Sequence, residues 1–209
     1  MFLLTLPSAQ FVGLERSVEL ICPMANPLKV LLFKLYVTLR DWVRPAPAMA
    51  RLPGEFIKGI NFGGEAVEIG GDRWQSYPEA LATGLATPGA TAATTYCVPD
   101  PYVSWETRIM LNSVIFKPQT LELEQPLPND SYDLYLWIIE NYKTHWHSLE
   151  LRVAGQSVAQ GLGYLPHRGW ARYGPYPITV TEGRLHLSLT TSEPNIDAHL
   201  MGLSLHKRP

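Results

Sequence analysis

Short runs of alternating apolar and polar residues follow one another through most of the chain. The alternation is regular over residues 149–153 and 185–189, which is the pattern of a strand with one buried face. Residues 132–140 are rich in Tyr, Leu, Trp and Ile and apolar on both faces, which predicts a central strand buried on two sides. Such strands, with no helical pattern between them, predict an all-β fold, an antiparallel β-sandwich.

The remaining elements of this region are predicted from shorter patterns. Apolar alternation on either side of the turn at Glu182 and Gly183 predicts a β-hairpin over 178–189. Residues 78–95 are rich in Ala, Thr, Gly and Pro without periodicity, which indicates a long irregular loop. Further strands are predicted at 58–62, 66–69, 107–116, 120–123 and 201–205.

The first 53 residues differ from the rest of the chain. Residues 28–43 are predicted to form an amphipathic helix, capped by Asn26 and ended by Pro45 and Pro47. It is shorter than the ~20 apolar residues that a membrane span needs. We therefore expect it to lie on a membrane surface or a partner protein, or to pack on its own domain. A Pro-rich linker follows, so the expected division is a leader, 1–53, and a β-sandwich, 54–209.

Composition and charge exclude several classes of protein. The 209 residues are 46% apolar and 11% aromatic, enough for a sizeable core. Seventeen basic and nineteen acidic residues leave a net charge of -2, which argues against a nucleic-acid partner. The two cysteines, Cys22 and Cys97, form neither a disulfide framework nor a zinc ligand set. No basic residue precedes the apolar run at Met1, so it is a poor secretory signal, and the compartment stays open.

The motifs that carry enzyme chemistry are missing or weak. The sequence contains no nucleophile elbow and no P-loop. Glu122 and Glu124 lie on one predicted strand, which favours a solvated strand face over an acid–base pair. His145 and His147 favour a polar loop edge over a metal site, because no Cys or acidic residue stands at ligand spacing. We therefore expect a non-enzymatic protein without metal or cofactor.

Aromatic residues stand mainly in predicted loops. Apolar sugar faces stack on aromatic rings, so a loop cluster of this kind favours carbohydrate binding. The alternative is that these rings form small cores within the loops. The loop aromatics considered as binding residues are Trp74, Tyr142, Trp146, Trp170 and Tyr173.

Five segments resemble, in order, the malectin-type domains. They are 60–74 with its two Gly-Gly pairs, the central strand and aromatic loop at 132–142, the strand and turn at 149–156, the late hairpin at 177–187, and the final strand at 198–205. The resemblance implies a jelly-roll-like β-sandwich that binds carbohydrate through loops at one end. It covers about residues 56–206.

The resemblance also implies roles for particular residues. In a lectin of this family, aromatic residues and one aspartate line the sugar site, and Trp74 and Tyr142 fall at two of the aromatic positions. A third aromatic position is Lys143 here. Three residues compete for the position of the aspartate, Glu193, Asn195 and Asp197. Glu140 matches a glutamate that we interpret as a structural cap of backbone groups at the strand end.

These observations favour a non-catalytic carbohydrate-binding module whose partner is an oligo- or polysaccharide. The alternative is a malectin-like scaffold or protein-interaction module, which the helix at 28–43 would dock to a membrane or a partner enzyme.

Overall fold

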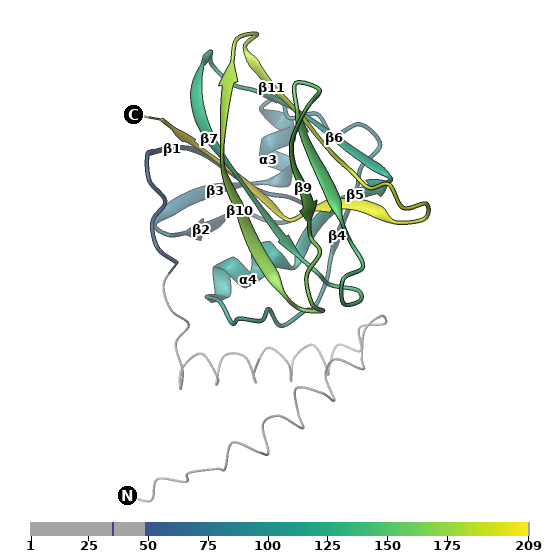
Figure 1. The fold of residues 1–209 in the computed structure, drawn as a ribbon. Coiled ribbons are helices and arrows are strands. Elements are labelled where there is room, and N and C mark those ends of the chain that lie inside the picture. Colours follow the sequence, from purple (N-terminus) through teal and green to yellow (C-terminus); the bar gives the residue numbers. More distant parts are fainter. Residues whose placement is uncertain (1–34, 36–48, 209) are drawn as a thin grey trace, which may run out of the picture. The chain divides into compact units, whose positions relative to one another are not determined.

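The computed structural model describes Leu35 and residues 49–208. Apart from Leu35, the predicted helix at 28–43 lies outside the described residues, and so does the first half of the predicted linker, residues 44–48. Residues 49–208 belong to one compact unit and form an all-β fold (Figure 1). Within this part of the chain, no helix is long and apolar enough to cross a lipid bilayer.

The strands are short and follow one another closely, as the alternating pattern predicts. Two short helices interrupt them in the described residues. In chain order the elements are β1 (Glu55–Asn61), β2 (Val67–Ile69), β3 (Asp72–Ser76), α3 (Tyr77–Ala82), β4 (Thr91–Thr94), α4 (Trp105–Leu111), β5 (Ser113–Pro118), β6 (Thr120–Pro126), β7 (Asp130–Ile139), β8 (Leu149–Val153), β9 (Gln156–Leu162), β10 (Trp170–Val180), β11 (Arg184–Thr190), β12 (Asp197–Leu200) and β13 (Gly202–Lys207).

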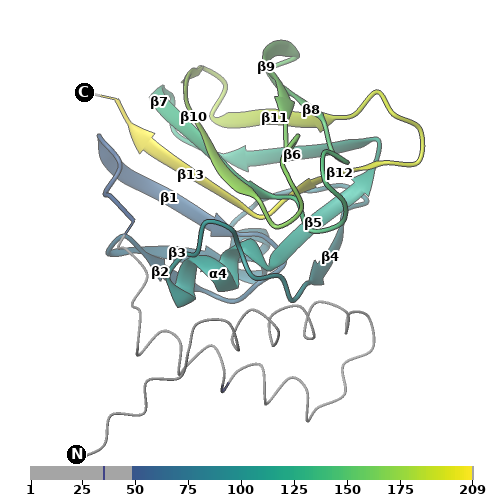
Figure 2. The same cartoon turned by 60° about the horizontal axis from the view of Figure 1, so that its bottom comes forward.

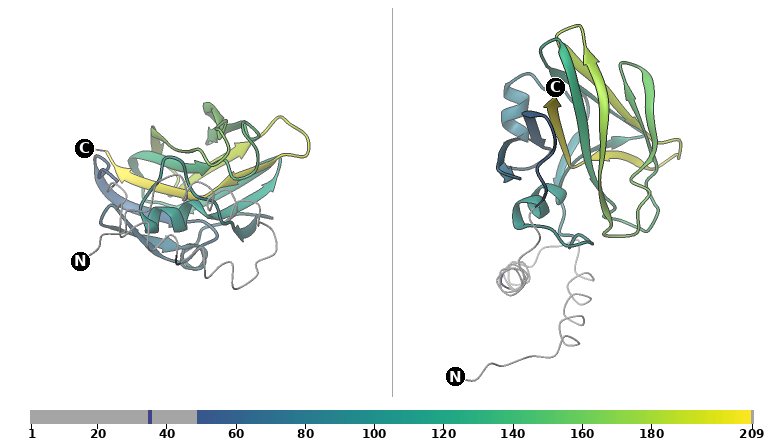
Figure 3. Two further views of the ribbon diagram at one scale, coloured as in Figure 1. Left: turned by 90° about the horizontal axis from the view of Figure 1, so that it is seen from below. Right: turned by 60° about the vertical axis from the view of Figure 1, so that its left-hand side comes forward.

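The strands form three sheets. The largest has the order β10-β7-β13-β1-β3-β2, a second has β6-β11-β8-β9, and the smallest has β12-β5-β4. All neighbouring strands are antiparallel except β1 and β3, which run parallel over two residue pairs. Only Met201 separates β12 from β13, so the chain passes there from the smallest sheet to the largest. Figures 2 and 3 show the same layers from other directions.

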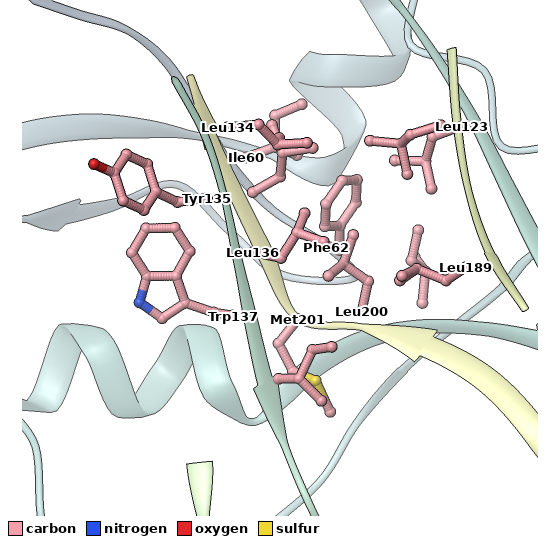
Figure 4. Packing of buried hydrophobic residues seen from close by; sticks show 14 of the residues in the cluster. Ile60, Phe62, Leu123, Leu134, Tyr135, Leu136, Trp137, Leu189, Leu200 and Met201 are labelled. Carbon is pink, nitrogen blue, oxygen red and sulfur yellow. The ribbon is translucent and has the colours of Figure 1, made fainter. Parts of the chain in front are cut away.

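The central strand β7 is buried on both faces, as predicted. Leu134 and Leu136 point into the space between the sheets, where they face Leu123 of β6 and Leu189 of β11 (Figure 4). Tyr135 and Trp137 lie on the other side of β7, and both side chains are almost completely buried. The core therefore has a main layer between the sheets and a second layer on the outer face of the six-stranded sheet.

The helix α4 covers part of that outer face. A strand was predicted at 107–116, but its first half is helical, and only Ser113 to Pro118 form β5. Ser104 caps the helix by accepting a hydrogen bond from the Thr107 N–H. The sulfur of Met110 packs close to Gly202 of β13, where a Cβ atom would come within 2.6 Å of it.

The segment 78–95 is also more regular than predicted. It contains most of α3 and the whole of β4. Ser76 and Glu79 form a capping box at the start of α3, in which each side chain accepts a hydrogen bond from the other residue's backbone N–H. The prediction of a long irregular loop is therefore wrong over α3 and β4.

The hairpin predicted over 178–189 is absent. The strand β10 pairs with β7 in the six-stranded sheet, whereas β11 pairs with β6 and β8 in the four-stranded sheet. The turn at Gly183 therefore connects two sheets and does not join two paired strands. The alternation of each strand was correct, but alternation does not specify the partner strand.

The final residues of the predicted linker belong to the folded unit. Met49 and Leu52 pack against the hydrophobic core, and a guanidinium nitrogen of Arg51 lies 3.6 Å from a carboxylate oxygen of Asp72. The folded region therefore includes residues before the predicted boundary at 54.

Candidate functional site

A groove lies against one face of the smallest sheet. It encloses about 370 Å³, and we call it the β4–β5–β12 groove. Cross-strand neighbours line its floor, since His199 of β12 pairs with Phe116 of β5, and Val114 of β5 pairs with Ala93 of β4. The residues that line it are Ala93, Thr95, Val114, Phe116, Asn141, Tyr142, Trp146, His147, Asn195, Asp197 and His199.

One wall of the groove is the loop that follows β7, and Glu140 holds this loop in place. The Glu140 side chain is completely buried. Its carboxylate accepts hydrogen bonds from the backbone N–H groups of Tyr142, Trp146 and His147, at 3.1, 3.2 and 3.0 Å. The structural role expected for Glu140, a cap of backbone groups at the strand end, is confirmed.

The Glu140 carboxylate also binds the imidazole of His147, whose Nδ1 lies 3.0 Å from it. Burial alone would raise the pKa of Glu140. The hydrogen bonds from His147 and from the Tyr142 backbone outweigh that effect and hold the pKa below its ordinary value. Glu140 is therefore an ionised anchor of the loop.

A second histidine packs against the first. The rings of His147 and His199 meet edge to face with their centroids 4.0 Å apart. His199 is 4% exposed, and its Nε2 has no hydrogen-bond partner among the described residues. Burial, together with the neighbouring His147, lowers its pKa to about 3. The floor of the groove therefore carries a neutral imidazole at neutral pH.

Tyr142 and Trp146 form an exposed pair of aromatic rings at the groove. The two ring centroids lie 5.4 Å apart, and the side chains are 57% and 36% exposed. The ammonium of Lys143 lies 4.7 Å from the Tyr142 centroid and 4.6 Å from the Trp146 centroid. We call Tyr142 and Trp146 the Tyr142–Trp146 ring pair.

Another part of the groove comes from the start of β12 and the residues just before it. Asn195 and Asp197 both line the groove, whereas Glu193 does not. Asn195 has a φ of 65°, in the left-handed region that Asn tolerates better than most residues. Of the three residues that competed for the acidic position, Asp197 is therefore the carboxylate at the groove.

Trp74 lies elsewhere, in the core. It belongs to β3, is 2% exposed and meets Trp137 edge to face with ring centroids 4.9 Å apart. Gly59 makes room for it, because a Cβ there would lie 2.5 Å from the indole ring. A ring buried in this way has no free face for a sugar, so Trp74 is a core residue, contrary to the prediction.

Trp170 and Tyr173 also do not line the groove. Both lie in β10, not in a loop as predicted. The Trp170 indole N–H donates to the carbonyl of Pro101 at 2.6 Å, and the Tyr173 hydroxyl accepts from the Gly163 N–H at 2.8 Å. Their polar atoms therefore hold neighbouring loops.

Several groove residues were not predicted from the sequence. Phe116, Thr95 and Asn141 gave no signal, because the strands β4 and β5 that position the first two were predicted incorrectly. His199 offered a weak signal, since it interrupts an apolar strand at a position whose neighbours are buried. No group of three or more His, Cys, Asp or Glu side chains in the described residues is arranged to hold a metal ion.

Comparisons with known proteins show similarity in structure but not in sequence. No family model and no curated protein sequence matches the chain. A β-glucuronidase 2 of Bacteroides uniformis, a calcium-binding mutant, matches with a TM-score of 0.60 and 12% identity over 73% of this chain and 18% of its own. The ANXUR2 extracellular domain of Arabidopsis thaliana matches with a TM-score of 0.58 and 15% identity, over 73% of this chain and 48% of its own.

A third similar structure is the plant receptor-like kinase FER, with a TM-score of 0.57 and 12% identity over 73% of this chain and 42% of its own. The chain therefore spans less than half the length of each of these proteins. At such low identity the likeness is one of fold. The described part of the chain is a malectin-like β-sandwich, a fold of the carbohydrate-binding-module type.

Proposed function

We propose that the chain is a non-catalytic carbohydrate-binding module and that the β4–β5–β12 groove is its sugar site. The observation that carries this proposal is a convergence of distant segments. The loop after β7 supplies Tyr142 and Trp146, and the segment 195–197, which ends at the first residue of β12, supplies Asn195 and Asp197, at one groove. The two segments are about fifty positions apart in the sequence. Tyr142 and Trp146 are candidate loop aromatics of the sequence analysis, and Asn195 and Asp197 are candidates for the acidic position that the family resemblance implies.

The groove has the mixture of groups that a sugar requires. The Tyr142–Trp146 ring pair and Phe116 offer apolar ring surface for the apolar face of a pyranose. The side chains of Asp197 and Asn195 offer hydrogen-bonding groups for its hydroxyls. A groove of about 370 Å³ falls within the usual size range of small-molecule sites.

The arrangement of carboxylates supports a binding role over hydrolysis. Glycosidases use two carboxyl groups, one of which has a raised pKa so that it can act as an acid. Asp197 is the one carboxylate among the described residues that line the groove. Glu140, which contacts His147 from behind, is buried, and its pKa is lowered, not raised.

A glycan array with the full-length protein tests the proposal, followed by calorimetry with the best ligand. An aromatic stacking contact contributes on the order of 1 kcal/mol, so Tyr142→Ala and Trp146→Ala should each weaken binding about fivefold to tenfold. Trp105→Ala is the matched control, because Trp105 is 39% exposed and carries the Arg108 guanidinium at 5.7 Å but does not line the groove. The control should bind like the wild type. Absence of any glycan ligand, or an equal loss in all three variants, would contradict the proposal.

A protein-interaction module is the second candidate. The observation in its favour is that the similar structure of FER is also known in complex with the peptide RALF23 and the protein LLG2. In this candidate the helix predicted at 28–43 docks the module to a membrane or a partner protein. It predicts that the full-length protein captures a partner that a chain lacking residues 1–48 does not, while no glycan binds.

A further inference from the structure

The Tyr142–Trp146 ring pair already binds a cation, the ammonium of Lys143. That ammonium lies within 5 Å of both ring centroids, at 4.7 and 4.6 Å, which is the geometry of a cation–π contact. Lys143 itself is exposed and makes no ion pair with the described residues. The rings alone therefore hold the ammonium, and it marks where a cation is favoured at the edge of the groove.

The electrostatic character of the groove agrees with this position. Asp197 lines the groove and forms no ion pair with the residues that the structure describes. No Lys or Arg is found among the described lining residues. His199, on the floor, stays neutral because burial lowers its pKa to about 3. The groove thus offers aromatic faces and the Asp197 carboxylate, and no Lys or Arg side chain among the described lining residues occupies it.

We propose that the glycan recognised by the groove carries a protonated amine, as polymers of glucosamine do, and that its ammonium takes the place of Lys143 at the Tyr142–Trp146 ring pair with Asp197 as counter-charge. This inference rests on the proposed sugar-binding function and names its ligand class. The ammonium of the ligand and the Lys143 ammonium compete for the same ring faces. Lys143 is therefore a competitor that must swing away when the ligand binds, which its long exposed side chain allows.

An acidic sugar fits the same groove poorly. A uronate or sulfate group would be attracted to the Lys143 ammonium at the edge of the groove, but it would be repelled by the Asp197 carboxylate within the groove. Like charges at close range are unfavourable. An amino sugar keeps the pyranose ring for stacking and adds a charge opposite to that of the Asp197 carboxylate.

Three matched oligosaccharides test the inference by calorimetry with the full-length protein. All have the same β-1,4 backbone and chain length, and they differ only at carbon 2, which carries an ammonium in the glucosamine oligomer, an acetamide in the N-acetylglucosamine oligomer and a hydroxyl in the glucose oligomer. In mildly acidic buffer of low salt, where the amine is protonated, the glucosamine oligomer should bind about fivefold to tenfold more tightly than the other two. Added salt should reduce this preference.

Variants separate recognition in the groove from general attraction to an acidic protein. Asp197→Asn should remove most of the preference for the amine. Glu193→Gln removes an equal charge nearby, from a residue that does not line the groove, and should retain the preference. Lys143→Ala removes the competitor and should raise the affinity for the glucosamine oligomer about twofold to fivefold.

The outcomes distinguish the two proposals. If the glucose oligomer binds as tightly as the glucosamine oligomer, the amine inference is wrong while the sugar-binding function stands. If Glu193→Gln and Asp197→Asn lower the preference for the glucosamine oligomer equally, the position proposed for its ammonium is wrong. The same holds if Lys143→Ala weakens binding of the glucosamine oligomer. If none of the three sugars binds and the glycan array is also empty, the sugar-binding function itself fails.

Discussion

The carboxylate of Glu140 and the imidazole of His147 form a buried pair, with Nδ1 of His147 3.0 Å from each carboxylate oxygen. The same carboxylate accepts the backbone N–H groups of Tyr142, Trp146 and His147. One side chain at the end of β7 therefore fixes both ends of the loop that carries the Tyr142–Trp146 ring pair. The stability of this loop and the shape of the groove depend on the same group.

Glu140→Ala should destabilise the protein strongly. The substitution leaves three backbone donors and a buried histidine without their acceptor, which costs on the order of 3 kcal/mol in the free energy of unfolding. Urea unfolding monitored by tryptophan fluorescence measures it. Glu122→Ala is the control, since the Glu122 side chain is exposed and its carboxylate lies 4.0 Å from the Lys117 ammonium, and it should cause little change. A similar midpoint for the two variants would mean that the Glu140 hydrogen bonds are energetically unimportant.

The stability of the protein should fall in acid because of His199. Its pKa is lowered from an ordinary value of 6.5 to about 3, so between these values the unfolded chain binds a proton that the folded chain does not. The free energy of unfolding therefore decreases as the pH falls from about 6.5 toward 3. At about 1.4 kcal/mol per pKa unit, the full decrease is on the order of several kcal/mol.

His199→Phe keeps a ring against His147 and removes the titrating group, so its stability should depend less on pH over this range. Urea unfolding at a series of pH values measures the slope. The exposed His186, which lies beside Glu124, provides the control, and His186→Gln should keep the wild-type slope. Glu140 acts in the same direction at lower pH, because stability gained from its lowered pKa is lost once the carboxylate is protonated. Equal slopes for His199→Phe and the wild type would refute the assignment to His199.

Trp74→Ala should weaken the fold and leave sugar binding unchanged. Removing a buried indole that packs against Trp137 leaves a large cavity, and such substitutions cost about 3–5 kcal/mol. Thermal unfolding measures the loss, and calorimetry at a temperature where the variant is folded measures binding. Trp105→Ala, at an exposed position, is the control for stability. A large loss of glycan affinity in folded Trp74→Ala protein would show that Trp74 contributes to the binding site.

A fragment that begins at Met49 should be more stable than one that begins at Gly54. Met49 and Leu52 pack against the core, and burial of two partly covered apolar side chains contributes about 1–2 kcal/mol. Denaturant unfolding of 49–209 and 54–209 compares them. Since the strands of the sandwich all lie after residue 54, both fragments should fold. Equal stability would show that residues 49–53 contribute nothing, and failure of both to fold would show that the leader is required.

Local pattern by itself determined the all-β class and the faces of many strands. The alternation over 149–153 and 185–189 specifies which side chains of β8 and β11 are buried, since the side-chain period of a strand is two whatever its partner. The two-sided apolar character of 132–140 likewise identified β7 as the central strand. The cap role of Glu140 was interpreted correctly through its match to a glutamate of the malectin-type domains, and its hydrogen bonds to the loop backbone confirm it.

The tertiary structure decided the features that depend on distant partners. Residues 105–111 contain Ile, Met and Leu, which suit a strand as well as a helix. They form α4 because Ser104 caps them and because Thr107, Arg108, Met110 and Leu111 are buried on one helical face. Trp74 follows a Gly-Gly turn like a loop residue. It is buried because Gly59, fifteen positions earlier, leaves space for its ring.

The groove is also a feature that depends on distant partners. Sequence placed Tyr142 after a rigid strand but could not choose among Glu193, Asn195 and Asp197, because their order in the chain does not show which of them faces the loop after β7. The pairing of β12 with β5 brings Asp197 and His199 to the groove beside Phe116, whereas Glu193 does not line it. A strand's alternation is written in its own residues, whereas its register depends on contacts with a strand far away in the chain, so a site built across strands appears only when the sheet is assembled.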